Sequence, residues 1–151
     1  MRKEVFPFIL IFFLCGCATS GPMAPLDMSA PGWDVRQGQA VWKPDSKKPE
    51  IAGDVVLATN PNGNSYVQFS KTMPIVSAQR RPRGWEVEFP PENKRYSGGG
   101  DGPNRIVWLQ LLKAIEGREV TGDWRLSHPS EKFIALENEE SGERLEVQFE
   151  R

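Results

Sequence analysis

The chain has 151 residues, with 19 basic and 20 acidic side chains and a formal net charge of −1. This balance argues against a nucleic-acid partner, because such partners favour a strongly basic face. The length suits one domain of ordinary size. The only two cysteines, Cys15 and Cys17, lie near the N-terminus, so the rest of the chain must fold without a disulfide.

The first residues are typical of a secretory signal peptide. Arg2 and Lys3 precede an apolar run over residues 5–14. A permanent membrane-spanning helix needs roughly 20 apolar residues, so this run is too short for one. The run ends in Leu14-Cys15-Gly16-Cys17, which resembles the lipobox of bacterial lipoproteins.

In bacterial lipoproteins, the lipobox cysteine receives a diacylglycerol, the chain is cut before it, and the new amine is acylated. The resemblance therefore implies a signal peptide over residues 1–16 and a lipid anchor at Cys17. The alternative is a signal peptide that is cut elsewhere, with two incidental cysteines. In enteric bacteria, an Asp directly after the acylated cysteine resembles an inner-membrane retention signal. The residue after Cys17 is Ala18, so this signal is absent. We therefore expect a cell-envelope protein at the outer membrane, facing the periplasm.

A linker follows the anchor. Residues 18–34 contain three prolines, several small residues and little periodicity, as in a flexible tether. The sequence thus predicts an acylated Cys17 and tether over residues 17–35, and one folded domain over residues 36–151.

From residue 36 the pattern predicts strands. Residues 85–89 and 145–150 alternate apolar and polar side chains, as in antiparallel sheets with one buried face. Turn-forming sequences such as Asn62-Gly63 and Ser141-Gly142 separate the strands. Further strands are expected at residues 40–43, 54–59, 66–70, 75–80, 124–127 and 133–137. The expected fold class is mainly β (α+β), a curved antiparallel sheet or incomplete barrel.

One segment predicts a helix. Residues 103–115 carry apolar side chains at gaps of three and four, with Pro103 suited to the first turn and Gly117 to the position after the end. We expect this helix to pack on the concave face of the sheet. The alternative, a membrane-binding surface helix, is disfavoured because the segment has few basic residues.

No pattern in the sequence predicts catalysis, a cofactor or a metal site. His128 is the only histidine, and a zinc site would need a second His or a free thiol in the mature chain. The glycines at 98–100 and 102 lack the Lys-Ser/Thr of a P-loop, and they are expected to form a flexible link to the helix. The acidic residues at 137–146 are expected on a solvated strand face. We therefore expect a protein that is not an enzyme.

Arg80, Arg81 and Arg83 cluster at a predicted hairpin turn. This cluster is interpreted either as an ordinary solvated rim or as a patch that faces anionic lipid headgroups or an acidic partner.

The order of these elements resembles the LolA/LolB lipoprotein-localisation family, and among its members the outer-membrane lipoprotein LolB in particular. The resemblance is carried by residues 66–75, with the sequence YVQFSKTMPI, then by 85–89, 93–96, the helix up to Gly117, and the hairpin over 132–149. In the family, an incomplete barrel encloses an apolar cavity that receives acyl chains, and a protruding loop acts at the membrane. By position, the resemblance implies that role for Met73 or Ile75.

Three hypotheses follow. The first is a lipoprotein that binds acyl chains of lipids or lipoproteins in an apolar cavity, accepts them from a periplasmic carrier, and assists lipoprotein localisation to the outer membrane. The expected cavity lining is Trp85, Val87, Phe89, Leu109, Leu112 and Ile115. The second is a structural or assembly lipoprotein with a filled core that acts through protein contacts. The third is an envelope hydrolase, which would need a cleft where Asp101, Asp123 or His128 converge.

Overall fold

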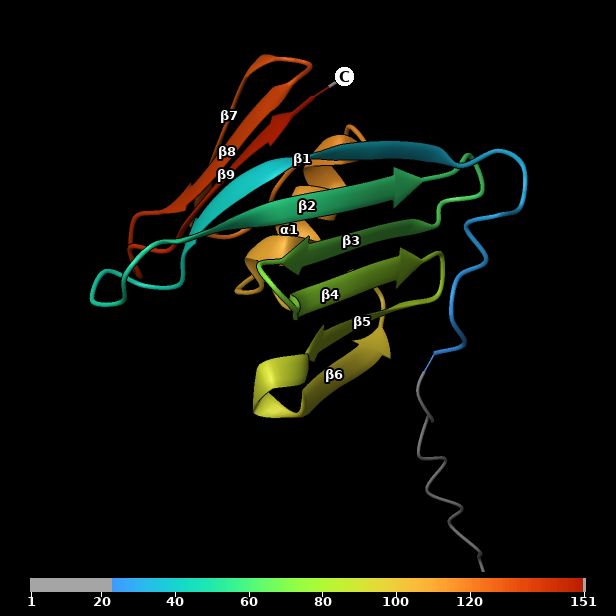
Figure 1. The fold of residues 1–151 in the computed structure, drawn as a ribbon, viewed down its shortest axis with the longest axis horizontal. Helices are drawn as coiled ribbons and strands as arrows, with labels where there is room; N and C mark the ends of the chain where they lie inside the picture. The colour runs from blue at the N-terminus through green and yellow to red at the C-terminus, as the bar shows by residue number, and fades with distance from the viewer. Residues whose placement is uncertain (1–22, 151) are drawn as a thin grey trace, which may run out of the picture.

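The structure is a computed structural model that describes residues 23–150. This part of the chain forms nine strands, one α-helix and a short 3-10 turn (Figure 1). The first six strands precede the helix α1 (Val107–Ile115), and the last three follow it. The strands are β1 (Asp34–Lys43), β2 (Ile51–Thr59), β3 (Ser65–Ser70), β4 (Pro74–Arg81), β5 (Gly84–Phe89), β6 (Lys94–Gly99), β7 (Trp124–Ser130), β8 (Phe133–Asn138) and β9 (Arg144–Phe149), with the 3-10 turn η1 (Pro90–Glu92) between β5 and β6.

All nine strands join one antiparallel sheet in the order β6-β5-β4-β3-β2-β1-β9-β8-β7. The last strand of the chain returns to pair with the first, since Trp42 of β1 lies opposite Leu145 of β9. Within the described residues, β6 and β7 are the two edges, and the sheet is curved but does not close into a barrel (Figure 1). The predicted class, a mainly β fold with an open, curved antiparallel sheet, is confirmed.

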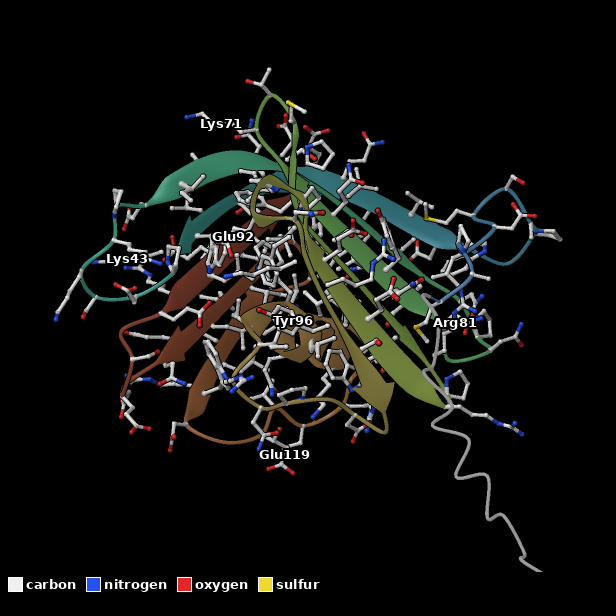
Figure 2. All side chains as sticks on the ribbon, turned by 90° about the horizontal axis from the view of Figure 1, so that it is seen from below. Lys43, Lys71, Arg81, Glu92, Tyr96 and Glu119 are labelled. Carbon is white, nitrogen blue, oxygen red and sulfur yellow. The ribbon has the colours of Figure 1, made fainter. Side chains whose placement is uncertain are left out.

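The two faces of the sheet follow the alternation in the sequence. Along β3, Val67 and Phe69 are fully buried, whereas their neighbours Tyr66 and Gln68 are partly exposed on the outer face. The inner face carries the core, and its apolar side chains fill the space between sheet and helix (Figure 2). Period-two alternation thus places one set of side chains against α1 and the other against solvent.

The helix α1 lies on the concave face and contacts β3 and β4 (Figure 1). Leu109, Leu111 and Leu112 have no exposed surface. The helix begins at Val107 and not at Pro103 as predicted. Residues 103–106 instead form a turn, because the backbone carbonyl of Asn104 accepts hydrogen bonds from the side chains of Gln110 and Trp124. The predicted position and packing of the helix are confirmed, apart from its first turn.

The strand β6 was not predicted from the sequence. All its side chains are exposed, so it shows no alternation of apolar and polar residues. Its final residues Gly98 and Gly99 pair with β5, although residues 98–102 were expected to form a flexible link. A Cβ atom at Gly98 would lie 3.1 Å from the indole nitrogen of Trp85. Glycine therefore allows β6 to approach β5 closely at this point.

The C-terminal end of α1 is held by charged side chains that we call the Arg80 network: Arg80, Asp101, Glu116 and Arg118. Arg80 of β4 is only 4% exposed, and its guanidinium donates to Glu116 at 2.7 Å and to Asp101 at 2.9 Å. Arg118 also pairs with Asp101, at 2.8 Å. The network connects β4, the loop after β6 and the end of the helix.

The predicted tether is described from residue 23 onwards. Residues 23–33, here called the N-terminal strap, lie across the outer face of β3–β5, and Asp34 already belongs to β1. The backbone N–H of Met23 donates to Glu86 at 2.9 Å, and Arg81 donates to the carbonyl of Ala24. Residues 1–22, which include the predicted signal peptide and Cys17, lie outside the described residues. Within residues 23–150, no helix has the length and apolar character needed to cross a membrane.

Candidate functional site

An apolar pocket of about 360 Å³ lies on the concave side of the sheet, at the N-terminal end of α1. Its walls come from segments that are far apart in the sequence: β1, β5, β6, the loop before α1 and the turn between β8 and β9. Its volume is at the lower end of the range of roughly 300–1,000 Å³ that is typical of small-molecule sites. The lining residues are Trp42, Trp85, Phe89, Tyr96, Pro103, Arg105, Ile106, Val107, Trp108 and Glu143. We call this the aromatic pocket.

Stacked aromatic rings support one side of the pocket. Trp108 of α1 stacks on Phe69 with ring centroids 5.2 Å apart, and Trp42 meets Trp108 edge-on at 5.4 Å. On β5 and β6, Phe89 and Tyr96 form a second edge-to-face pair at 6.2 Å. Aromatic pairs in these arrangements contribute more stabilising free energy than their buried area alone would give. The pocket therefore has preformed apolar walls.

One acidic side chain belongs to the wall. Glu143, in the turn between β8 and β9, accepts a hydrogen bond of 2.9 Å from the indole N–H of Trp42. Burial raises the pKa of this carboxyl to about 7; the nearby charge of Asp45 adds to the rise, and the bond from Trp42 opposes it. Arg105 also lines the pocket and is exposed. The wall thus combines an aromatic surface with one carboxyl group that is easily protonated.

The six residues expected to line a cavity divide into two groups. Trp85 and Phe89 line the aromatic pocket. Val87, Leu109 and Leu112 are fully buried in the packed core, and Ile115 is partly buried against it at the other end of the helix. The space under the middle of α1 is therefore filled by these side chains themselves, and the pocket lies beside this packed region.

The two candidates for a membrane-facing loop also differ in environment. Met73 is 73% exposed in the turn between β3 and β4, whereas Ile75 is partly buried against the core. Of the two, only the Met73 side chain projects freely from the sheet.

The residues considered for a hydrolase occupy separate environments. Asp101 belongs to the Arg80 network, and its pKa is lowered mainly by the hydrogen bond from Arg118. Asp123 lines a separate hollow with Asn138 and Glu140. His128 is exposed on the edge strand β7. Among residues 23–150, no group of three or more His, Cys, Asp or Glu side chains is placed to hold a metal.

Sequence reasoning did not assign Trp42, Tyr96, Ile106 and Glu143 to the site. The high number of tryptophans, five in the chain, was the available signal for Trp42 and Trp108. No local signal marks Glu143, because its contact with Trp42 joins residues 101 positions apart. Such contacts follow from the return of β9 to β1.

No protein-family model matches this chain, and no curated protein sequence matches it. The resemblance to the lipoprotein-localisation family therefore stays a prediction from the sequence.

Proposed function

We propose that this protein is a lipid-anchored envelope protein that binds acyl chains of lipids or lipoproteins and assists lipoprotein localisation to the outer membrane. The anchor is the acylated Cys17, and the binding site is the aromatic pocket. The observation that carries the proposal is the apolar lining of that pocket beside an unclosed sheet.

The physical basis of binding is the burial of methylene groups. Each buried CH₂ contributes about 0.8 kcal/mol, so several carbons in contact with Trp85, Phe89 and Ile106 suffice for measurable affinity. The volume of the pocket suits the end of one chain more than a whole diacyl lipid. A periplasmic carrier would deliver the lipoprotein whose acyl chain enters here.

The test is saturable binding of a fluorescent fatty acid to the protein without its signal peptide and acyl group. Ile106→Glu places a charge in the pocket wall, on a side chain that is half-buried. We expect this variant to weaken binding at least tenfold, because the carboxylate must lose water when the chain enters. The matched control is Val35→Glu on β1, where the side chain is 48% exposed. It should bind as the parent protein does.

Circular dichroism on both variants shows whether the fold is kept. Equal binding by Ile106→Glu and the parent protein would place the acyl chain elsewhere. A second assay offers a radiolabelled lipoprotein on its carrier, and uptake by the parent protein but not by Ile106→Glu would support the localisation role.

A second candidate is a structural or assembly lipoprotein that acts through protein contacts. The packed core beneath α1 favours it, since Leu109, Leu111 and Leu112 leave no exposed surface there. In this case a well-folded parent protein would bind no fatty acid, and it would take up no lipoprotein.

A further inference from the structure

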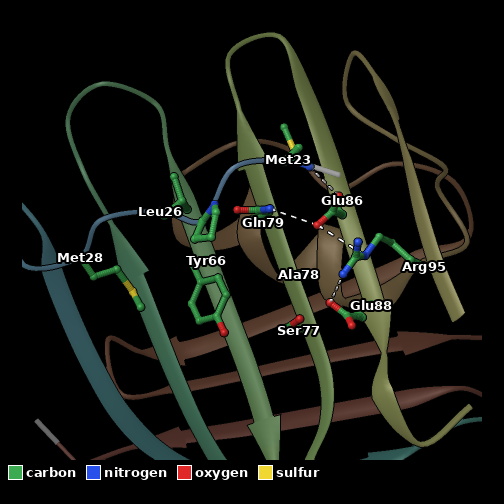
Figure 3. Close-up of a pocket in the computed structure, with 11 residues that line it drawn as sticks. Met23, Leu26, Met28, Tyr66, Ser77, Ala78, Gln79, Glu86, Glu88 and Arg95 are labelled. Carbon is green, nitrogen blue, oxygen red and sulfur yellow. Dashed lines mark hydrogen bonds and ion pairs between the residues drawn. The ribbon is translucent and has the colours of Figure 1, made fainter. Parts of the chain in front are cut away.

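The N-terminal strap fixes the position of Met23, the first described residue, on the folded domain. Leu26 and Met28 lie against the outer face near Tyr66, and Met23 reaches Glu86 on β5 (Figure 3). The Met23 side chain also lines a shallow hollow with Arg81 and Arg83. The described part of the chain therefore begins, at Met23, beside the turn between β4 and β5.

This position limits how far Cys17 can lie from that turn. Residues 18–22 alone separate Cys17 from Met23. A fully extended run of this length spans at most about 20 Å. A tether that began at Asp34 would reach much farther, so the strap removes most of the slack that the sequence provides.

The end of the sheet beside Met23 has a basic rim. Arg83 is exposed in the turn, whereas Arg81, at the end of β4, is partly buried and donates to the carbonyl of Ala24. Within the described residues, neither arginine forms an ion pair with a carboxylate, in contrast to Arg80. The turn between β2 and β3 lies at the same end, because a Cβ at Gly63 would be 3.5 Å from Pro82.

The turn between β3 and β4 lies at the opposite end of the sheet. Met73 and Lys71 lie in the turn that begins β4, whereas Arg81 ends that strand (Figure 2). Along a strand of eight residues, the two turns are about 24 Å apart. Lysines occur at this end too, so the two ends differ less in charge than in their distance from Met23, which lies beside Arg81 and Arg83.

We infer that the β4–β5 end of the sheet, with Arg83 exposed on it, rests on the anionic headgroups of the membrane that holds Cys17, and that the Met73 end points away from it. Each basic side chain near such a surface adds attraction within a Debye length. The inference rests on the proposed lipid anchor, but it does not depend on acyl binding in the pocket. It assigns Met73 to contacts on the periplasmic side and not to the anchoring membrane.

The test uses the full chain, expressed in bacteria that process lipoproteins, purified from their membranes and reconstituted in vesicles. Because Cys15 and Cys17 are the only cysteines, an acylated mature chain has no free thiol. A single introduced cysteine can therefore carry an environment-sensitive dye. Asn62→Cys marks the end near Arg81, and Lys71→Cys is the matched position at the opposite end; both are exposed.

In vesicles of phosphatidylcholine and phosphatidylglycerol with quencher-bearing headgroups, we expect strong quenching of the dye at Asn62→Cys and little at Lys71→Cys. Equal quenching, or the reverse order, would overturn the orientation. Absence of the chain from the membrane fraction would overturn it as well, since the anchor would then be missing.

Arg83→Gln tests the role of charge. Added to Asn62→Cys, it should lower the ratio of headgroup-contacting to free dye about fivefold in anionic vesicles, with little effect in pure phosphatidylcholine. An unchanged ratio would remove the charge of Arg83 from the proposal. Fatty-acid binding is measured separately, so its failure with the expected quenching order would count against the pocket alone.

Discussion

The two ends of α1 are held in different ways. At the C-terminal end, Glu116 joins the Arg80 network and also accepts a hydrogen bond of 2.7 Å from Ser65. At the N-terminal end, Ile106 provides no side-chain cap, and the space beside it is the aromatic pocket. One short helix is therefore fixed at one end by buried polar contacts and borders an apolar opening at the other. The comparison shows that a filled core and an apolar pocket can border the same helix.

The largest expected effect concerns the packed middle of the helix. Leu112→Ala should lower the free energy of unfolding by about 2–5 kcal/mol, because it leaves a cavity where the side chain has no exposed surface. Ile106→Ala, at the pocket end, should cost about 1 kcal/mol or less, since its side chain is only half-buried. Urea denaturation measures both, and equal losses would contradict the difference between the two ends.

A smaller effect is expected from the Arg80 network. Glu116→Gln keeps the shape of the side chain but removes its charge, leaving buried Arg80 with the half-exposed Asp101 as its partner. We expect a loss of about 1–3 kcal/mol in the free energy of unfolding. The matched control is Glu92→Gln, whose partner Lys94 is exposed, and it should cost less than about 0.5 kcal/mol. A similar loss in both variants would show that the network is no stronger than a surface pair.

The smallest effect concerns Glu143 at the pocket and depends on pH. Its pKa is about 7 in the folded protein, against an ordinary value of 4.5. Between these values the folded state binds more protons than the unfolded state, so the free energy of unfolding falls as pH rises from about 4.5 to 7. Glu143→Gln should remove this fall and make the protein more stable above pH 7 by on the order of 1–2 kcal/mol. This range is smaller than the full pKa difference would give, because the Glu143 side chain is partly exposed to solvent.

Thermal unfolding at pH 5 and pH 8 measures this difference. The control is Glu140→Gln, which changes an exposed carboxylate of the same turn. Its stability should change with pH as much as that of the parent protein. The charged neighbours to consider are Asp45, which acts on Glu143, and Arg105 and Glu140, which line hollows with it. If the stability of Glu143→Gln changes with pH as much as that of the parent protein, another group causes this pH dependence.

Eight of the nine strands, and the helix, were predictable from local patterns. In β5, for example, alternation identifies Val87 as an inward residue, and it is fully buried. The strand β6 was not predictable, since Lys94 to Gly99 are all exposed and only their pairing with β5 makes them a strand. The first turn of the helix was overestimated, because the bonds to Asn104 come from Gln110 and Trp124.

The candidate site was only partly predictable for the same reason. Trp85 and Phe89 line the pocket as expected from their strand, but Leu109 and Leu112 pack in the core although their pattern is equally apolar. Local sequence does not show which apolar side chains pack against other side chains in the core and which line a pocket. That depends on how β5 and β6 face β1 and the turn between β8 and β9 across the concave side of the sheet.

The sequence by itself determined the alternation that makes a one-sided sheet, the turns that join its strands and the apolar helix that covers it, because these depend on residues a few positions apart. The tertiary structure decided the return of β9 to β1, the contact of Glu143 with Trp42, the burial of Arg80 and the course of the N-terminal strap. Each of these joins segments distant in the chain. Their energies arise from packing and loss of water, which local patterns do not specify.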